Sequence, residues 1–521
     1  MNPSKHSQTR RLFLQRSVAL GAAGMAPLVY QLEAMAAAAA QHVDARVDPK
    51  AGGGGNIDLA AAAPGYKALV CLFMYGGNDN ANFIIPYDPT EYATYAAARS
   101  AVLAAGYNSD PTNATVQLRG LLPIGQVNGK LPGDPLPPGL TSGRPFAFHP
   151  NVGKYTNQTA ANIRSDGLPW LWDNDKLALI ANVGSLAVPL NKTQYNNKSL
   201  PRPQNLFSHS DQQTTWMTSA ATGYSSTGVG GRIADLVDSM NVPPMGQPKI
   251  ATCISIAGVN VYQAAENAQA YQILSSGPVG LNTPYFGYTG VSTAISTALN
   301  EQITRSRGSY FESQWGGMMN YSLQTRTAIN AALVANPLPA GITFRTGGNS
   351  LSQQLQMVAK LINASAQLGM VRQIFFVQIG GFDVHGAEFH PQNNTNWNRI
   401  SEAVYDFYNA MVGIGAANQV TLFSASDFGR TLDSNGLGTD HGWGGHHFVV
   451  GGAVGQSQLR GTFPTVALGT SDDIGRGALL PTTSTYQYHA ALAKWFGLSD
   501  SDIATVLPNL SNFSPTGLVL T

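Results

Sequence analysis

Four continuous apolar runs constrain the fold of this chain most strongly. They cover residues 66–74, 177–183, 373–379 and 419–424, and each runs into a glycine-containing or polar loop. Apolar and polar residues do not alternate within them, so both faces of each predicted strand are expected to be buried, as in a parallel sheet. Helical periodicity at Ser350–Leu368 and Ile400–Ile414 supplies covering helices. The pattern predicts an α/β fold with a mostly parallel central sheet flanked by helices.

Three of these strands are followed by an aspartate. Asp79 lies in GGNDNAN, Asp383 in GGFDVHG and Asp427 in SDFGRT. Ligands of open α/β sheets bind beyond the carboxyl ends of the strands, so we expect the three carboxylates to meet at one edge. Two of them have a simpler alternative: Asp79 is also suited to cap a turn, and Asp427 to pair with Arg430.

Histidine is concentrated in the same part of the chain. Five of the ten histidines lie between positions 385 and 447. Histidine and carboxylate together are the ligands of divalent metal sites, so the sequence predicts a centre for one or two ions. Zinc, manganese, magnesium and calcium are not distinguished. The predicted ligands are Asp79, Asp383, His385, Asp427, His441 and His446.

Spacing refines some of these candidates. Asp383 and His385 are two residues apart, so in an extended segment both side chains leave the same face and reach one ion. His446 and His447 are adjacent, so only one of them faces the site from a strand. His390 is either a third ligand or a surface histidine. Trp443 is either a lid over the site or core packing.

A nucleophile is suggested by the segment RPQNLFSHSDQQ. Ser208 has His209 and Asp211 beside it and precedes a predicted helix at Gln212–Ala220. A helix start offers free N–H groups to an anionic substrate. We predict catalytic roles for Ser208 and for His209, the latter as an acid/base group or a ligand. The simpler alternative is that Ser208 or Ser210 caps the helix; His149 is a weaker candidate.

The N-terminus carries the segment TRRLFLQ followed by the apolar run VALGAAGM. This arrangement resembles a twin-arginine (Tat) export signal, which implies a periplasmic or secreted protein. We predict a signal peptide over residues 1–40 and a flexible leader over 41–64. The apolar run is too short to span a bilayer comfortably, so no stable membrane span is expected after cleavage; an uncleaved anchor is the alternative.

Composition limits the partners and the redox chemistry. The net charge of +1 argues against nucleic acid as a partner. Cys71 and Cys253 are the only cysteines and lie in apolar runs, so they are either buried thiols or a disulfide. Residues 65–521 are predicted to form one domain. Insertions near 88–172 and 258–345 are expected to cap the carboxyl edge of its sheet.

Several motifs in order carry a resemblance to a known family. They are the export signal, GGNDNANFIIPYD, LFSHSDQQTTW, GGFDVHG, SDFGRT and DHGWGGHHFVVGG. The chain resembles the exported bacterial family called domain of unknown function 1501 (DUF1501). That family is usually placed in the alkaline phosphatase-like superfamily, with sulfatases and phosphodiesterases. The resemblance implies an alkaline phosphatase-like fold and a centre with two metal ions.

Carried over residue by residue, the resemblance implies that Asp79 and Asp427 hold one ion, and Asp383, His385 and His441 the other. Ser208 would lie near both ions. In that superfamily an aspartate and an adjacent histidine help to hold one ion. In the alternative assignment, Asp440 and His441 supply this Asp-His pair, and Asp427 lies behind the ligands. No Cys-x-Pro-x-Arg motif is present, which argues against a formylglycine sulfatase.

The function expected from this resemblance is metal-dependent hydrolysis of phosphate or sulfate esters outside the cytoplasm. The substrate would be an anionic ester, either a small molecule or a polymer. The alternative is a non-catalytic envelope or secreted protein. Such a protein would use a degenerate metal site for structure or for binding a partner or a glycan.

Overall fold

The computed structural model describes residues 65–104, 121–124, 146–153, 165–278, 293–305, 308–386, 389–514, 518 and 520. The predicted signal peptide and leader lie outside these residues. In the part that is described, none of the helices has the length and apolar character needed to cross a membrane. The chain divides into two compact units, one of residues 1–56 and 279–326 and the other of residues 57–278 and 327–521.

The larger unit is built on a central sheet, which has nine strands among the residues described. They are β1 (Lys67–Met74), β5 (Leu177–Gly184), β6 (Cys253–Ser255), β7 (Ala270–Gln272), β8 (Arg372–Ile379), β9 (Val420–Ser426), β12 (Gly445–Gly451), β13 (Leu459–Arg460) and β14 (Thr483–Ser484). The order is β13-β5-β12-β9-β1-β8-β6-β7, with β14 also beside β5. Only β12 runs antiparallel to its neighbours. The predicted α/β class with a mostly parallel sheet is confirmed.

The middle of this sheet brings three strand ends level with one another. In β1, Met74 pairs with Ile379 of β8 on one side and with Ser426 of β9 on the other. All three pairs of strands are aligned in parallel, so their carboxyl ends emerge at one edge. The loops carrying Asp79, Asp383 and Asp427 therefore start from adjacent positions.

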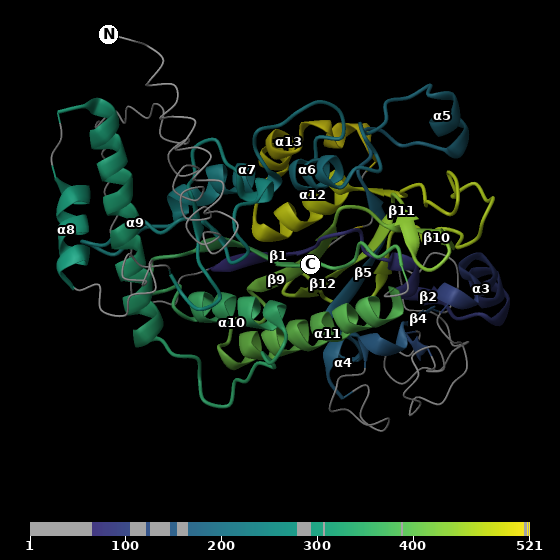
Figure 1. Cartoon of the computed structure of the whole chain (residues 1–521), viewed down its shortest axis with the longest axis horizontal. Helices are drawn as coiled ribbons and strands as arrows, with labels where there is room; N and C mark the ends of the chain where they lie inside the picture. Colours follow the sequence, from purple (N-terminus) through teal and green to yellow (C-terminus); the bar gives the residue numbers. More distant parts are fainter. Residues whose placement is uncertain are drawn as a thin grey trace, which may run out of the picture. The chain divides into compact units, whose positions relative to one another are not determined.

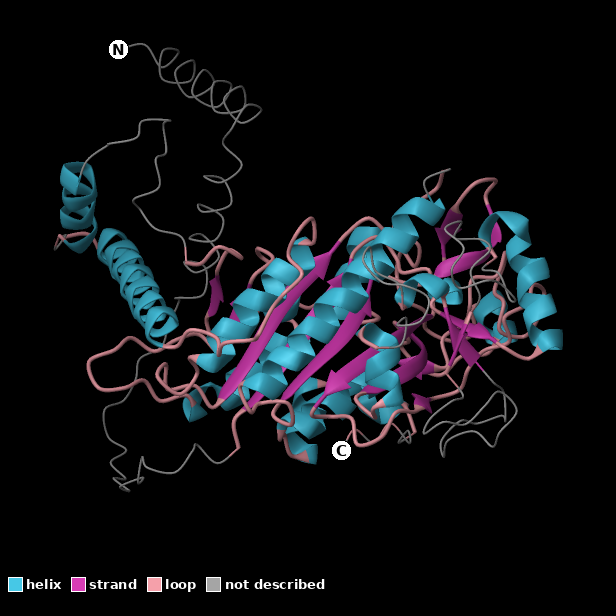
Figure 2. Ribbon diagram, turned by 90° about the horizontal axis from the view of Figure 1, so that it is seen from below, coloured by secondary structure: helices cyan, strands magenta, loops and turns pink. Residues whose placement is uncertain are grey.

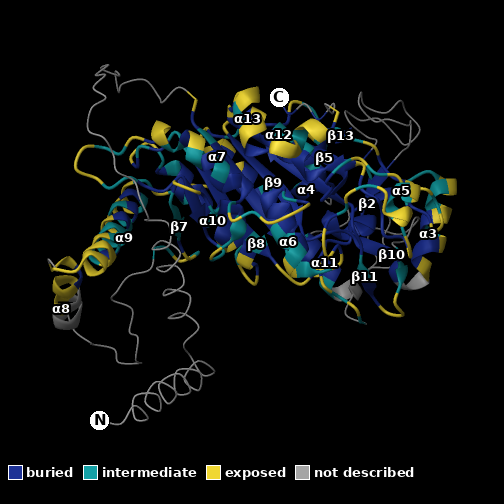
Figure 3. Cartoon of the chain, turned by 90° about the horizontal axis from the view of Figure 1, so that it is seen from above, coloured by how far each residue is buried: buried dark blue, intermediate teal, exposed yellow. Residues whose placement is uncertain are grey.

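Helices cover both faces of the sheet (Figures 1 and 2). The helices on one face are α4 (Gly167–Asp173), α10 (Ser350–Asn363) and α11 (Phe389–Gly413), and those on the other are α6 (His209–Thr218), α7 (Val229–Val237), α12 (Thr485–Phe496) and α13 (Asp500–Val506). Alternate residues of β1 enter the two cores: Leu72 packs with the first set and Phe73 with the second. Both faces of the strands are thus buried, as Figure 3 shows, which explains why the runs are continuously apolar.

Smaller elements complete the described chain. The insertion predicted near 88–172 contributes α3 (Pro89–Leu103) and most of a small sheet in the order β2 (Ile84–Pro86), β4 (Phe146–Phe148), β3 (Leu122–Pro123). A hairpin-like pair is formed by β10 (Arg430–Ser434) and β11 (Thr439–His441). The other elements are α5 (Lys192–Asn197), α8 (Thr293–Thr304), α9 (Tyr310–Ala335), and the short 3-10 helices η1 (Asn80–Asn82), η4 (Pro150–Val152), η6 (Asp238–Met240), η7 (Val261–Gln263) and η8 (Pro508–Asn512).

The two cysteines are free and buried. Cys71 lies in β1 and Cys253 in β6, and β8 separates these strands. The alternative of a disulfide is therefore wrong, and the buried thiols serve as small apolar groups.

Candidate metal centre

The loop after β1 passes unusually close to the two neighbouring loops. Gly76 has φ +109°, and a Cβ atom there would lie 2.5 Å from the backbone nitrogen of Asp383. Gly77 has φ +80°, and a Cβ atom there would lie 2.5 Å from the Phe428 ring. Only glycine combines these φ angles with such close approach. The two glycines let the ends of β1, β8 and β9 form one compact edge.

Three side chains from distant segments converge at this edge. His209 is the first residue of α6, Asp383 lies in the loop after β8, and His441 ends β11. Their ligand atoms all lie within 4.8 Å of one another. The two Nε2 atoms are 3.0 Å apart. Oδ2 of Asp383 lies 3.4 Å from Nε2 of His209, and Oδ1 of Asp383 lies 3.4 Å from Nε2 of His441. We call His209, Asp383 and His441 the metal trio.

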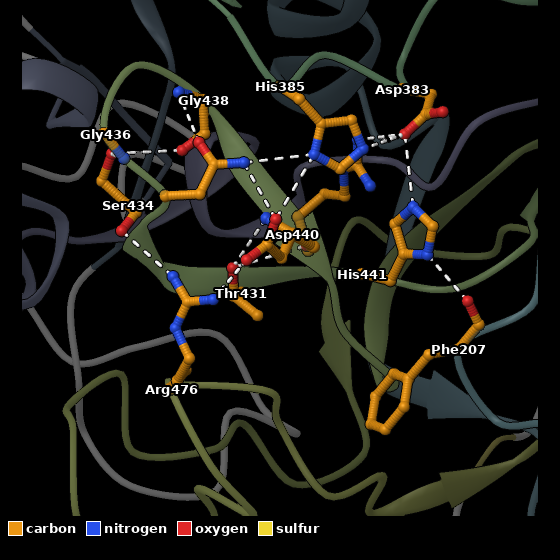
Figure 4. Close-up of polar contacts among 12 residues, drawn as sticks. Phe207, Asp383, His385, Thr431, Ser434, Gly436, Gly438, Asp440, His441 and Arg476 are labelled. Atoms are coloured by element: carbon orange, nitrogen blue, oxygen red, sulfur yellow. Dashed lines mark hydrogen bonds and ion pairs between the residues drawn. The ribbon is translucent and has the colours of Figure 1, made fainter.

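Hydrogen bonds determine which ring nitrogen of each histidine is free. The Nδ1 atom of His209 is 2.6 Å from a carboxylate oxygen of Asp427. The Nδ1 atom of His441 is 2.7 Å from the Phe207 carbonyl oxygen (Figure 4). Both partners accept, so each Nδ1 carries the proton and each neutral ring presents a lone pair at Nε2. Two such lone pairs facing each other at 3.0 Å repel unless a cation or a proton lies between them. The donor set therefore fits a metal ion.

Asp427 supports His209 rather than joining the trio. Its side chain is fully buried. The Oδ2 atom lies within hydrogen-bonding distance of His209 Nδ1, Gln213 Nε2 at 2.9 Å and the Gly76 backbone N–H at 3.3 Å. Carboxylates of this kind orient metal-binding histidines from behind. This position agrees with the alternative assignment, in which Asp427 lies behind the ligands. A direct ligand role remains a prediction, because Oδ1 is buried without a hydrogen-bond partner among the described residues.

Arg430 binds Asp383, so the alternative of an Asp427–Arg430 pair is not what the structure contains. The buried guanidinium donates from Nη2 to Asp383 Oδ1 at 2.7 Å. Burial raises the pKa of this carboxyl, but the hydrogen bond and charge of Arg430, with His209 and His385, outweigh it and bring the pKa to about 2. Asp383 is therefore ionised at neutral pH, as a ligand must be.

The two histidines of the trio differ in basicity. The hydrogen bond to Asp427 raises the pKa of His209, because it stabilises the imidazolium form. Burial lowers the pKa of His441. A proton therefore competes with a metal ion for the Nε2 atom of His209 more strongly than for that of His441.

His385 lies at the rim of the trio. Its Nε2 atom is 2.8 Å from Asp383 Oδ1, and its Nδ1 atom is 3.1 Å from the Asn435 amide nitrogen and 3.3 Å from Asp440 (Figure 4). Arg476 in turn binds Asp440. The predicted proximity of Asp383 and His385 is confirmed. The group of residues whose ligand atoms lie within 4.8 Å of one another does not include His385, so its ligand role remains a prediction.

Asp79 faces an arginine instead of the trio. Its Oδ2 atom is 2.5 Å from Nη2 of Arg99, and both side chains are buried. Arg99 comes from α3, within the insertion after β2. One carboxylate oxygen of Asp79 is thus bound by a buried guanidinium, while Oδ1 is buried without a hydrogen-bond partner among the described residues. Asp79 is not part of the trio, and its ligand role remains a prediction.

His446 and His447 point to opposite faces of β12, as their adjacency predicts. The Nδ1 atom of His446 accepts from the Asn182 N–H at 3.0 Å, and its ring stacks on Phe463. His447 lies 3.2 Å from the Ser424 hydroxyl and packs against Trp216. Both are core residues, so the ligand role predicted for His446 is not supported by its position.

Trp443 and His149 contact groups outside the trio. Trp443 is buried and donates to the Ser185 hydroxyl at 3.3 Å, which favours packing over a lid. His149 accepts from the Asn151 N–H at the start of η4. The side chain of His390 lies outside the described residues.

Ser208 occupies the N-cap position of α6, although its side chain does not cap the backbone. Its hydroxyl donates to Asp211 at 2.5 Å and lies 3.3 Å from that of Ser210. The nucleophile role remains a prediction, since these contacts turn the hydroxyl toward Asp211. The neighbouring His209, predicted as an acid/base group or a ligand, is the residue that enters the trio.

Fold and centre together define an α/β protein with two histidines and one aspartate that could hold a metal ion at the carboxyl edge of its sheet. A family described as "Protein of unknown function (DUF1501)" matches residues 312–507. The matched segment contains Asp383 and His441 but not His209. It supports the resemblance to that family over this part of the chain. No curated protein matches the chain.

Proposed function

We propose that this chain is an exported hydrolase of phosphate or sulfate esters that uses one metal ion held by the trio. The proposal depends mainly on one observation: the Nε2 atoms of His209 and His441 face each other 3.0 Å apart, and the Asp383 carboxylate lies 3.4 Å from each. Two imidazoles and a carboxylate suit zinc and other first-row transition ions, whereas magnesium and calcium prefer oxygen ligands throughout. We therefore favour zinc or manganese.

The trio is open to solvent. About a quarter of each histidine side chain and 44% of the Asp383 side chain are exposed, so solvent reaches the ligand atoms. Three protein ligands with further positions open are typical of catalytic rather than structural sites. A metal ion bound there would polarise the ester and lower the pKa of an attacking water.

The chain's own residues keep the ligand atoms in place. Asp427 and the Phe207 carbonyl hold the two imidazoles in the tautomer that presents Nε2, and Arg430 holds the Asp383 carboxylate. Such preorganisation lowers the cost of assembling a reactive geometry. The resemblance to the alkaline phosphatase-like superfamily supports an anionic ester as the substrate. The TRRLFLQ segment supports export to the periplasm or medium.

Metal content and turnover of the purified protein test this proposal. We expect bound zinc or manganese and hydrolysis of at least one of p-nitrophenyl phosphate, bis(p-nitrophenyl) phosphate and p-nitrophenyl sulfate. Asp383→Asn should lose at least about 100-fold in turnover through loss of the metal. Asp433→Asn is the matched control, because this partly exposed aspartate forms an ion pair with Arg476 and is not part of the trio. Wild-type protein that binds no metal would contradict the proposal.

A non-catalytic metal protein is the second candidate. It is favoured by the contacts of Ser208, whose hydroxyl is turned to Asp211. Metal bound in a 1:1 ratio without turnover of any of the three esters would support this candidate over the hydrolase.

A further inference from the structure

Two buried arginines stand among the aspartates of this edge. Arg99 pairs with Asp79, and Arg430 pairs with Asp383. The resemblance implies a second metal ion held by Asp79 and Asp427. Oδ2 of Asp79 is bound to Arg99, and Oδ2 of Asp427 is shared by three hydrogen-bond donors. Oδ1 of each carboxylate is buried without a hydrogen-bond partner among the described residues, so the case against that ion rests on charge rather than on a lack of ligand atoms.

Arg430 lies in the electrostatic field of all three carboxylates. Its side chain is fully buried. Burial lowers the pKa of its guanidinium, while the charges of Asp383, Asp79 and Asp427 all act to raise it. Only Nη2 has hydrogen-bond partners among the described residues, namely Asp383 at 2.7 Å and the Phe382 carbonyl at 3.3 Å. The cation is thus held mainly by carboxylate charge rather than by a full set of hydrogen bonds.

Arg99 neutralises Asp79 in the same way. Its Nη2 atom lies 2.5 Å from Asp79, and its Nη1 atom donates to the Thr431 carbonyl at 2.9 Å. Thr431 follows Arg430 directly, so the two guanidinium groups are tied to the same strand, β10.

Charge balance then limits how many metal ions the edge accommodates. Three aspartates and two arginines leave a single net negative charge, since the histidines are neutral as ligands. One divalent ion changes this to a single positive charge. A second would leave a charge of about +3 in a largely buried region, which is strongly unfavourable.

We infer that this edge binds one metal ion only. The guanidinium of Arg430 takes the place of a second ion by supplying a fixed positive charge. The inference rests on the proposed function, because it presupposes that the trio binds a metal. Arg430 is a positioning residue: it holds Asp383 Oδ1 and offsets the charge of Asp79 and Asp427 without contacting the substrate.

The test is the number of metal ions bound per chain, measured by equilibrium dialysis against Zn²⁺ and Mn²⁺ and by elemental analysis. We expect one equivalent for the wild type and two for Arg430→Ala, because the three carboxylates would then recruit a second cation. Arg430→Lys keeps the charge and should stay at one equivalent. Arg476→Ala is the matched control, since Arg476 also pairs with aspartates nearby, and it should stay at one.

Each outcome decides a different point. Two equivalents in the wild type or in Arg430→Lys overturn the inference, as does a folded Arg430→Ala protein with one equivalent or none. No metal in the wild type instead overturns the proposed function. Should Arg430→Ala fail to fold by circular dichroism, the wild-type and Arg430→Lys counts still decide the inference.

Discussion

At the residue scale, the tautomer of His209 depends on one buried carboxylate. Asp427 accepts a hydrogen bond from the Nδ1–H group at 2.6 Å, which leaves the Nε2 atom of His209 free to bind a metal ion. Sequence proximity does not create this pair, since the two residues are 218 positions apart. The same logic applies to His441, whose orienting partner is a backbone carbonyl.

Asp427→Asn should weaken metal binding by about 10- to 100-fold, because an amide no longer fixes the tautomer of His209. The affinity is measured by competition with a chromogenic chelator, and Asp433→Asn serves again as the control. Unchanged affinity in Asp427→Asn would show that this carboxylate does not orient a ligand.

At the scale of elements, the site depends on three strand ends meeting at the same level. Parallel pairing of β1 with β8 and β9 brings their carboxyl ends together, and Gly76 allows the loops to touch. The loop after β1 therefore acts as a spacer whose width sets the position of Asp383. Side chains added at this point should displace the ligand.

Gly76→Ala should destabilise the protein by more than the roughly 1–3 kcal/mol expected for backbone strain alone, and should also weaken metal binding. The added Cβ atom would lie 2.5 Å from the Asp383 nitrogen. Gly258→Ala is the matched control, because Gly258 also has a positive φ, +81°, but nothing lies within 4 Å of its Cβ position. Denaturant unfolding and chelator competition measure the two effects. Equal effects in both variants would contradict the spacer role.

At the scale of the whole molecule, the sheet separates two cores, and the core that contains Trp216 also contains two buried histidines. Burial lowers the pKa values of His447 and His489 to about 3. Both pack around Trp216. They are neutral in the folded protein over most of the acidic range, so they contribute to acid sensitivity independently of the metal trio.

Acid should therefore destabilise the fold between about pH 6.5 and pH 3. In that window the unfolded chain binds protons at these histidines and the folded chain does not, so the free energy of unfolding falls as the pH falls. The loss amounts to at most about 5 kcal/mol for each histidine at the acid end. Urea unfolding at pH 7.5, 6, 5 and 4 measures it. His447→Gln should show a shallower pH dependence than the wild type, and an identical slope would exclude this contribution.

The positions of the long strands and their burial on both faces follow from local sequence. The four apolar runs became β1, β5, β8 and β9 with ends shifted by at most two residues, because a strand buried on both faces needs an uninterrupted apolar run. The predicted helices at Ser350–Leu368 and Ile400–Ile414 correspond to α10 and α11, but α10 ends five residues earlier and α11 begins eleven residues earlier than predicted. The short strands β6, β7 and β13 have only two or three residues, too few to carry a pattern.

The position of the site at the strand ends was also predictable, since aspartates follow three strands that a parallel sheet must align. Which of them becomes a ligand was decided by tertiary contacts. Asp79 meets Arg99 from an insertion, whereas Asp383 meets two histidines from other segments. Sequence patterns report burial and periodicity over a few residues. The partner, tautomer and direction of a polar side chain depend on groups hundreds of positions away, which only the folded chain brings together.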